Sequence, residues 1–466
     1  MAQPNEHRIE RDSMGEMAVP ARAYWGAQTQ RAVLNFPISG YRFGRRFIRA
    51  MGLIKKCAAE VNRDLGRLKP DLANLIVKAA QEVVDGKLDE QFVLDVFQTG
   101  SATSTNMNAN EVIANRAIEL HTGKIGGKEP VHPNDHVNMG QSSNDVIPTA
   151  IHVAVGEALK YDLVPALRLL EEALHGKAVD FEKVMKIGRT HLMDATPIRL
   201  GQEFSGYAAQ GRKAVIRAEA AIKGLHELAI GGTAVGTGIN THPEFGRRVA
   251  QRLAEETGIP FYEADNHFEA QAAKDALVEA SGELKAIAVG LTKIANDIRW
   301  LGSGPRCGLG EVLLPPTQPG SSIMPGKVNP VMSEMLIQAC VQVIAADTAV
   351  MLCGRDSIFE LNTMMPTMAY NLLEAIRILS NAVRVFTERC VAGLEANQKR
   401  CEELVELSLA MCTSLAPVIG YDKAAEIAKE AYKTGKTVRQ VAMESKVLPE
   451  EQLDRILDPT TMTQPG

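Results

Sequence analysis

Two apolar stripes at helical spacing constrain the fold of this 466-residue chain more than any other feature of its sequence. The side chains of the stripes are, in order, Leu284, Ile287, Leu291, Ile294, Ile298 and Leu301, and then Leu372, Ile376, Leu379, Val383 and Phe386. Alternating steps of three and four residues place the members of each stripe on one face of a helix. Such a face must be buried against other helices, so the stripes predict long helices in a bundle and not a cofactor site.

Further helical patterns support an all-α fold. They cover residues 47–84, 145–176 and 198–228, and the segment 331–352 between the two stripes is apolar on most sides, as a central buried helix would be. Aromatic residues make up only 5% of the chain, which suits helices packed on helices. A helix of about 30 residues spans roughly 45 Å, which is more than a compact domain of this size needs. We therefore expect helices of different subunits to pack together.

The same patterns divide the chain into three predicted domains. Residues 1–140 contain several polar turns and form an N-terminal domain, and residues 141–394 form a central helical-bundle domain. After Leu394 the helical segments are short and are separated by prolines and glycines. Because such residues end helices, residues 395–466 are expected to form a small helical C-terminal domain.

Composition and charge exclude several classes of function. The net charge is −5 and both signs are interspersed, which argues against binding to nucleic acid. The seven cysteines are irregularly spaced and form no CxxC pair, so they indicate reduced thiols and neither a disulfide framework nor a metal centre. No apolar run approaches the roughly 20 residues of a membrane span, and the N-terminus lacks the apolar segment of a signal peptide. We expect a cytoplasmic protein that does not bind membranes.

A polar loop from Gly320 to Pro330, with the sequence GSSIMPGKVNP, is the strongest sign of a binding site. Its glycines and prolines interrupt any helix or strand, and glycine lets the backbone approach an anion and direct N–H groups at it. Lys327 adds a positive charge and Asn329 adds an oriented donor. The loop is therefore typical of a site for a carboxylate or phosphate, although a simple Pro/Gly-rich connector has the same composition.

Three other clusters of polar residues stand where a helical pattern begins or breaks. Residues 99–108 and 141–145 are rich in hydroxyl and amide side chains, which suit a substrate-facing turn and equally suit a helix N-cap. In residues 188–197, His191 beside Thr190 is the best acid–base candidate in the chain.

Two further motifs are interpreted as structural. His132-Pro133-Asn134-Asp135-His136 is a turn, and its two histidines lack a second cluster of ligands, so no metal is expected. The Gly-rich segment 230–238 fits neither the dinucleotide-binding nor the P-loop pattern. A flexible loop or a close crossing of two backbones is the favoured interpretation of that segment.

The loop from Gly320 to Pro330 resembles the signature of the fumarase/aspartase superfamily, and the similarity extends over nearly the whole chain. The stretches that are similar to class II fumarate hydratases are WGAQTQR at 25–31, RTHLMDAT at 189–196, GTAVGTGINTHP at 232–243 and NHFEA at 266–270. His191 lies in the second of them, at a position where aspartases usually carry glutamine. Val331 after the loop and the ending Leu457-Asp458-Pro459 are shared with aspartases, which keeps aspartate ammonia-lyase as the alternative.

The resemblance implies an assembly as well as a reaction. The assembly is a homotetramer of three-domain, all-α subunits with a core of about 20 helices, in which three subunits build each active site. The reaction is the reversible dehydration of L-malate to fumarate in the tricarboxylic acid cycle, with small dicarboxylates as ligands and neither a cofactor nor a metal. A non-catalytic protein on the same fold would have lost Ser321, Lys327 or His191, and all three are present.

The roles of individual residues follow from the same resemblance. Removing a proton next to a carboxylate places a second negative charge on that carboxylate, which Lys327 and Asn329 would stabilise. Ser321 would be the base, and His191 paired with Glu334 would be the acid that turns the departing hydroxide into water. The residues implied to hold the substrate carboxylates are Ser101, Thr103, Ser142, Ser143, Asn144 and Thr190.

The resemblance also marks a second site and one departure. A second, non-catalytic anion site is implied at His132, Asn134 and Asp135. Ala102 departs from the family, which usually has glycine in a Ser-Gly-Thr turn at this point. If the turn needs a positive φ, alanine costs about 1 kcal/mol there and shifts the neighbouring Thr103.

Overall fold

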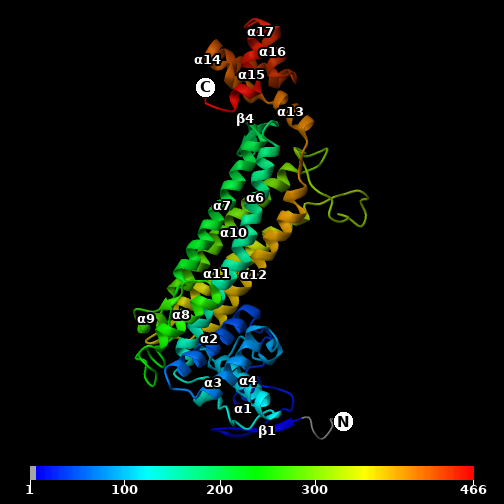
Figure 1. Cartoon of the computed structure of the whole chain (residues 1–466). Coiled ribbons are helices and arrows are strands. Elements are labelled where there is room, and N and C mark those ends of the chain that lie inside the picture. Colours follow the sequence, from blue (N-terminus) through cyan, green and yellow to red (C-terminus); the bar gives the residue numbers. More distant parts are fainter. Residues whose placement is uncertain (1–6, 466) are drawn as a thin grey trace. The chain divides into compact units, whose positions relative to one another are not determined.

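The computed structural model describes residues 7–465, and most of them lie in helices (Figure 1). These residues form two compact units. Unit 1 contains residues 7–165, 216–288 and 341–379, and unit 2 contains residues 166–215, 289–340 and 380–465. Within the described part of the chain, the strands are short and occur only in two-stranded pairs. The predicted all-α fold is confirmed.

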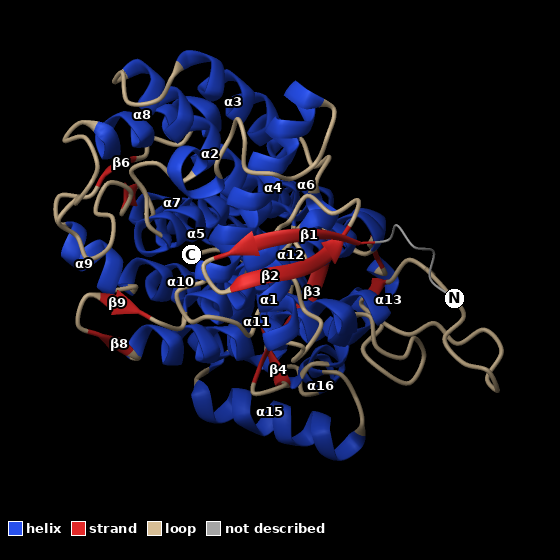
Figure 2. Cartoon of the chain, turned by 90° about the horizontal axis from the view of Figure 1, so that it is seen from below, coloured by secondary structure: helices blue, strands red, loops and turns tan. Residues whose placement is uncertain are grey.

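Unit 1 begins with an antiparallel hairpin that leads into a group of packed helices. Figure 2 shows the hairpin as the pair of red arrows β1 (His7–Asp12) and β2 (Gly15–Pro20). The helices that follow are α1 (Ala27–Asn35), α2 (Arg45–Asp64), α3 (Pro70–Val84), α4 (Thr103–Thr122) and α5 (Ser143–Ala158). The helical pattern over 47–84 is divided at Pro70, the first residue of α3, where the fixed φ of proline suits a helix start.

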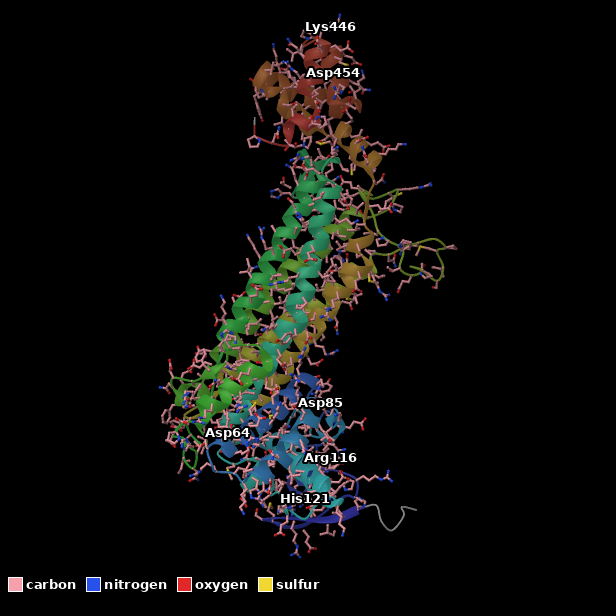
Figure 3. All side chains as sticks on the ribbon, in the orientation of Figure 1. Asp64, Asp85, Arg116, His121, Lys446 and Asp454 are labelled. Carbon is pink, nitrogen blue, oxygen red and sulfur yellow. The ribbon has the colours of Figure 1, made fainter. Side chains whose placement is uncertain are left out.

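Helix α2 is the central helix of this group. It contacts α3, α5 and α8, and Phe47, Met51 and Ile54 on it are fully buried. Helix α4 is tied to α3 by Arg116, labelled in Figure 3, whose Nε lies 2.7 Å from Oε2 of Glu82. The remaining elements of unit 1 are α8 (Phe245–Thr257), α9 (His267–Ala272), β5 (Glu227–Leu228), β6 (Tyr262–Glu263), β8 (Ser357–Ile358) and β9 (Leu361–Asn362).

Long helices contain residues of both units and carry the predicted stripes. They are α6 (Val164–Asp180), α7 (Leu200–Gly224), α10 (Asp275–Leu301), α11 (Val331–Arg355) and α12 (Met365–Arg389). The two stripes lie on α10 and α12, and every member is buried, which confirms the prediction from their spacing. The helix predicted over 145–176 is present as α5 and α6, joined by a π-helical turn at Leu159–Leu163.

Helix α11 differs from its prediction in two ways. It is not buried on most sides within one chain, since Val341 is 61% exposed and Met351 and Leu352 are also exposed. By length and composition it also passes as a membrane span, against the expectation from the sequence, although a core helix of a soluble protein passes the same test. The exposed apolar side chains explain both differences, because they raise the hydropathy without being covered in one chain. The helix carries Asp347, whose Oδ2 lies 2.6 Å from Nζ of Lys285 on α10.

Short helices form the end of unit 2 around a small apolar core. They are α13 (Gln398–Leu407), α14 (Ala416–Ile419), α15 (Tyr421–Thr434), α16 (Val438–Glu444) and α17 (Glu450–Ile456). Leu415, Ala442 and Leu453 are fully buried in this core. Arg439 of α16 binds Asp454 of α17, labelled in Figure 3, with 2.8 Å between Nη1 and Oδ1. The short helices predicted after Leu394 are therefore present.

The N-cap of α4 is Ala102. The sequence did not show whether its turn needs a positive φ, and the structure has one there. Its φ of 52° and ψ of 27° lie in the left-handed region, and its side chain is fully buried. Its N–H donates to the carbonyl of Thr99 at 2.7 Å, which closes the turn. A left-handed non-glycine residue is strained by about 1–2 kcal/mol. Because Thr103 is the first helical residue, this turn determines where its hydroxyl lies.

We expect Ala102→Gly to change the free energy of unfolding by less than about 1 kcal/mol. Glycine removes the strain of about 1 kcal/mol. It also loses a buried methyl group worth about 0.8 kcal/mol and makes the unfolded chain more flexible. Ala102→Val, which is larger and β-branched, should destabilise the protein by more than about 2 kcal/mol. Urea unfolding at one fixed protein concentration measures both variants, and a large gain in stability for the glycine variant would contradict this balance.

Candidate functional site

A polar pocket of about 420 Å³ in unit 1 brings several of the predicted clusters together. Its walls come from the first half of α4, from the turn 138–143 that leads into α5, and from the Gly-rich segment at 233–240. The residues predicted from the sequence that line the pocket are Thr103, Asn134, Ser142 and Ser143.

Hydroxyl groups at the starts of α4 and α5 form one connected chain. Oγ of Ser101 lies 2.7 Å from Oγ1 of Thr103, which in turn lies 2.7 Å from Oγ of Ser143. The next residue, Asn144, donates its Nδ2 to the carbonyl of Ala234 at 2.8 Å. Thr103 and Ser143 begin helices whose first N–H groups have no partner within the helix, and such helix starts favour anions. The pocket therefore has the hydroxyls and dipoles that a carboxylate needs.

Several pocket residues were not predicted from the sequence. Asn106 and Asn110 line the pocket on the same face of α4 as Thr103, and their steps of three and four residues are the signal that would have found them. The Gly-rich segment contributes Thr233 and Ala234. Of its two interpretations, the flexible loop does not fit, because hydrogen bonds hold its backbone, whereas a close backbone approach is present, since a Cβ at Gly231 would lie 2.9 Å from Cα of Gly246.

A buried lysine beside the pocket was also not predicted. Nζ of Lys55 on α2 donates to Oδ1 of Asn138 and to Oε1 of Gln141, each at 2.9 Å. Both amide side chains line the pocket, so Lys55 fixes their orientation. Burial lowers the pKa of Lys55 to about 7, and the nearby carboxylate of Asp145 acts in the opposite direction. The signal in the sequence is a lysine among the mostly apolar residues of the segment that forms α2.

The loop from Gly320 to Pro330 lies in unit 2 and is folded around the hydroxyl of Ser321. Oγ of Ser321 accepts the backbone N–H of Ile323 at 3.2 Å and that of Met324 at 3.1 Å. Two fixed N–H groups directed at one oxygen stabilise negative charge on that oxygen. The loop therefore directs two backbone N–H groups at Oγ of Ser321, as an oxyanion at this atom would require.

The ends of the same loop are held together by three residues. The N–H of Gly320 donates to the carbonyl of Lys327 at 2.8 Å, and Nδ2 of Asn329 donates to the carbonyl of Gly320 at 2.7 Å. A Cβ atom at Gly320 would lie 2.4 Å from the carbonyl oxygen of Lys327, so only glycine fits there. Asn329 closes the loop in this arrangement, while the side chain of Lys327 is exposed.

His191 lies at the tip of a hairpin in unit 2. The hairpin consists of β3 (Met185–Thr190) and β4 (Met193–Arg199), and the other short pair in this unit is β7 (Val312–Leu313) with β10 (Glu395–Ala396). The φ angles of His191 and Leu192 are +58° and +61°, the conformation of a two-residue hairpin turn with both central residues left-handed. The turn exposes Thr190 and His191.

Buried charges fix the base of this hairpin. Nη1 of Arg189 lies 2.8 Å from Oε2 of Glu311, and Nζ of Lys186 lies 2.9 Å from Oε2 of Glu203. Lys186 and Glu311 are both fully buried, so loss of either would leave an uncompensated charge in the interior. The hairpin thus presents His191 from a rigid base.

Glu334 lies in the first turn of α11 and is exposed. Within one chain, over the described residues 7–465, it forms no hydrogen bond or ion pair with His191. The pair that the resemblance implies is therefore not made inside a single chain.

The ring of His132 caps its own turn. Its Nδ1 accepts the N–H of Asn134 at 3.2 Å and that of Asp135 at 3.1 Å, at the start of the turn Pro133–Val137. The N–H of His132 donates to Nδ1 of His136 at 2.9 Å, and burial lowers the pKa of His136. Nδ1 of each ring therefore accepts backbone N–H groups, and the amides of the implied second anion site are already paired.

Known proteins that are similar to this chain are lyases. Residues 15–345 match the family described as Lyase, and residues 411–464 match the family described as Fumarase C C-terminus. Fumarate hydratase class II of Halobacterium salinarum is 57% identical over 461 residues, which are 99% of this chain and 98% of that protein. The mitochondrial fumarate hydratase of Rhizopus oryzae is 53% identical over 98% of this chain and 92% of that protein.

A solved structure extends the similarity from sequence to fold. The crystal structure of recombinant class II fumarase from Schistosoma mansoni matches with a TM-score of 0.94 and 39% sequence identity, and it covers 98% of this chain and 99% of that chain. Similarity of this extent involves the whole fold and not a single motif. The chain therefore belongs to the class II fumarate hydratase family of lyases.

Proposed function

We propose that the chain catalyses the reversible dehydration of L-malate to fumarate, as a step of the tricarboxylic acid cycle. The observation that carries this proposal is the pair of backbone N–H groups on Oγ of Ser321, in a loop that also holds Lys327. Aspartate ammonia-lyase is not favoured, because the relatives that match over the full length are named fumarate hydratases.

Proton removal is the first step. L-malate carries its hydroxyl group on C2, and the hydrogens on C3 are acidified by the adjacent carboxylate. Oγ of Ser321, stabilised as an oxyanion by the N–H groups of Ile323 and Met324, takes one proton from C3. The electron pair moves onto the adjacent carboxylate, and Lys327 and Asn329 stabilise the resulting dianion.

Loss of water is the second step. His191, acting with Glu334, gives a proton to the hydroxyl group on C2. The C2–O bond breaks, the electron pair on the dianion forms the C2–C3 double bond, and fumarate and water are the products. In the reverse direction the same two residues take a proton from the attacking water.

The remaining predicted residues hold the substrate. In this proposal its carboxylates are bound by Ser101, Thr103, Ser142, Ser143, Asn144 and Thr190, which is supported by the linked hydroxyls at the starts of α4 and α5. The second anion site at His132, Asn134 and Asp135 is retained as part of the proposal. An anion that uses the amides there must displace the ring of His132 from them. The proposed steps use no cofactor and no metal.

The proposed assembly is a homotetramer with a core of about 20 helices and active sites that each take residues from three subunits. Large apolar side chains beside the catalytic residues support this, since Ile323 is 83% exposed and Leu192 is 69% exposed in one chain. Each lies next to an exposed methionine, Met324 or Met193, and contiguous exposed apolar side chains usually mark an interface. Val341 on α11 is exposed in the same way.

The cytoplasm is the proposed compartment. All seven cysteines are free thiols, as a reducing environment favours. One of the relatives is named a mitochondrial form, so the family is not confined to a single compartment.

Purified protein should raise the ultraviolet absorbance of the fumarate double bond when it is mixed with L-malate, and not when it is mixed with L-aspartate. The preference for L-malate is expected because, in the proposed reaction, His191 protonates a departing hydroxide, which L-aspartate does not have. A rise with aspartate alone would identify an ammonia-lyase and remove His191 from its acid role. No rise with either compound would contradict the proposed reaction.

Ser321→Ala and His191→Asn should each lower kcat by at least about 100-fold, the usual contribution of an acid or base group. Both substitutions change a polar side chain and remove no apolar contact, so the assembly and the unfolding temperature should not change. Ser322→Ala in the same loop and His121→Asn at the exposed end of α4, labelled in Figure 3, are matched controls that should retain most of the activity. Near-normal turnover in either catalytic variant would remove that residue from its role.

Mixing the two inactive variants should restore activity. If Ser321 and His191 of one site come from different subunits, about one quarter of the sites in randomly mixed tetramers contain both intact residues. The two variants are unfolded together, refolded and assayed, and each variant treated alone is the control. Recovery no greater than that of the separate variants would show that a single chain supplies both residues.

A further inference from the structure

A buried carboxylate beside the pocket has no part in the proposed reaction. Asp145 is the third residue of α5, and its side chain is fully buried. Burial of a charged group is unfavourable unless hydrogen bonds and nearby charges compensate for it. Its position directly after Ser142, Ser143 and Asn144 therefore requires an explanation.

The carboxylate of Asp145 accepts hydrogen bonds from two different walls of the pocket. Oδ1 accepts the N–H of Ser142 at 2.9 Å, on the wall formed by the start of α5. Oδ2 accepts the N–H groups of Gly231 at 3.1 Å and of Thr233 at 2.9 Å, on the Gly-rich wall. The buried carboxylate thus ties the two walls together, beside the hydrogen bond from Nδ2 of Asn144 to the carbonyl of Ala234.

These contacts require an ionised side chain. All three partners are N–H donors, so both oxygens must act as acceptors. Burial raises the pKa of Asp145 to about 6, while the three N–H groups and Lys55 act in the opposite direction. At neutral pH the side chain is therefore mostly a carboxylate. A carboxamide of the same shape would direct an NH₂ group at a backbone N–H and lose at least one of the contacts.

The α5 wall carries groups that bind the substrate in the proposed function, and the Gly-rich wall lines the same pocket. The α5 wall presents Ser142 and Ser143, and Oγ of Ser143 lies 2.7 Å from Oγ1 of Thr103. The Gly-rich wall presents Thr233 and Ala234. A change in the separation of the walls displaces these groups together, and binding sites tolerate displacements of only about 0.5 Å.

We propose that Asp145 is a positioning residue that sets the width of the dicarboxylate pocket by holding the α5 wall and the Gly-rich wall together. It does not touch the substrate and transfers no proton. The inference rests on the proposed function for the identity of the ligand, while the pocket and the contacts of Asp145 lie entirely in unit 1.

Asp145→Asn should raise KM for L-malate and fumarate by at least about tenfold and lower kcat by less than about threefold, the pattern of lost binding. Asp145→Glu keeps the charge but lengthens the side chain, so it should fold and give a smaller rise in KM. Steady-state kinetics in both directions measure the two constants. Unchanged KM in both variants would overturn the proposal.

Glu111 provides a matched control. It is a buried carboxylate in the same unit that accepts the N–H groups of Gly26 at 2.8 Å, Gln28 at 3.0 Å and Thr29 at 3.1 Å. These contacts join α4 to α1 and not two walls of the pocket. Glu111→Gln should therefore lower the unfolding temperature as Asp145→Asn does but leave KM unchanged. An equal rise in KM for Glu111→Gln and Asp145→Asn would show that the rise is caused by lost stability. That result would overturn the proposal.

Binding of succinate separates this proposal from the proposed reaction. Succinate is a saturated dicarboxylate that cannot lose water, and titration calorimetry gives its Kd for each variant. If the wild-type chain makes no fumarate but binds succinate at least about tenfold more tightly than Asp145→Asn, the reaction is wrong and the role of Asp145 stands. Equal Kd values, or no binding by the wild-type chain, would overturn the role of Asp145 whatever the turnover.

Discussion

Backbone N–H groups directed at side-chain oxygens are the interaction on which the site depends. Helix starts and irregular loops leave such donors without partners in regular structure. In this chain they converge on Oγ of Ser321 and on the carboxylate of Asp145. In the proposed reaction they would stabilise charge at Ser321, and in the proposed role of Asp145 they hold the walls of the pocket. Because these donors belong to the backbone, neither function requires a flexible side chain to reorganise.

Features that depend on neighbouring residues in the sequence could be predicted. Periodicity is local, so the stripes on α10 and α12 were identified, and every member is buried. The resemblance of the Ala102 turn to one that usually contains glycine indicated where a positive φ could occur, and Ala102 has one. The loop around Ser321 was likewise marked by its glycines and prolines, which act on the backbone next to them.

Features that depend on contacts between distant segments could not be predicted. Gly231 is 86 residues from Asp145, and Asn138 is 83 residues from Lys55. In the sequence, Asp145 is an aspartate three residues after the N-cap Ser142. Such a residue is the same whether it only caps its own helix or also binds the backbone of the Gly-rich wall. The exposed side of α11 was missed for the related reason that apolar composition does not show whether one chain covers it. The domain limits near residues 140 and 394 and the roles of the site residues stay predictions.

The backbone N–H groups at Ser321 also link the proposed chemistry to the proposed assembly. A serine oxyanion is a strong base only where water is kept away, because water would solvate and protonate it and weaken the hydrogen bonds that stabilise it. In one chain Ser321 is only partly buried, and Ile323 and Met324, whose N–H groups bind its Oγ, expose their apolar side chains. A second subunit that covers these side chains would exclude water from the loop and fix the two N–H groups at the same time. Burial of apolar surface and activation of the base would then be one event, and the reactive form of Ser321 would belong to the proposed assembly.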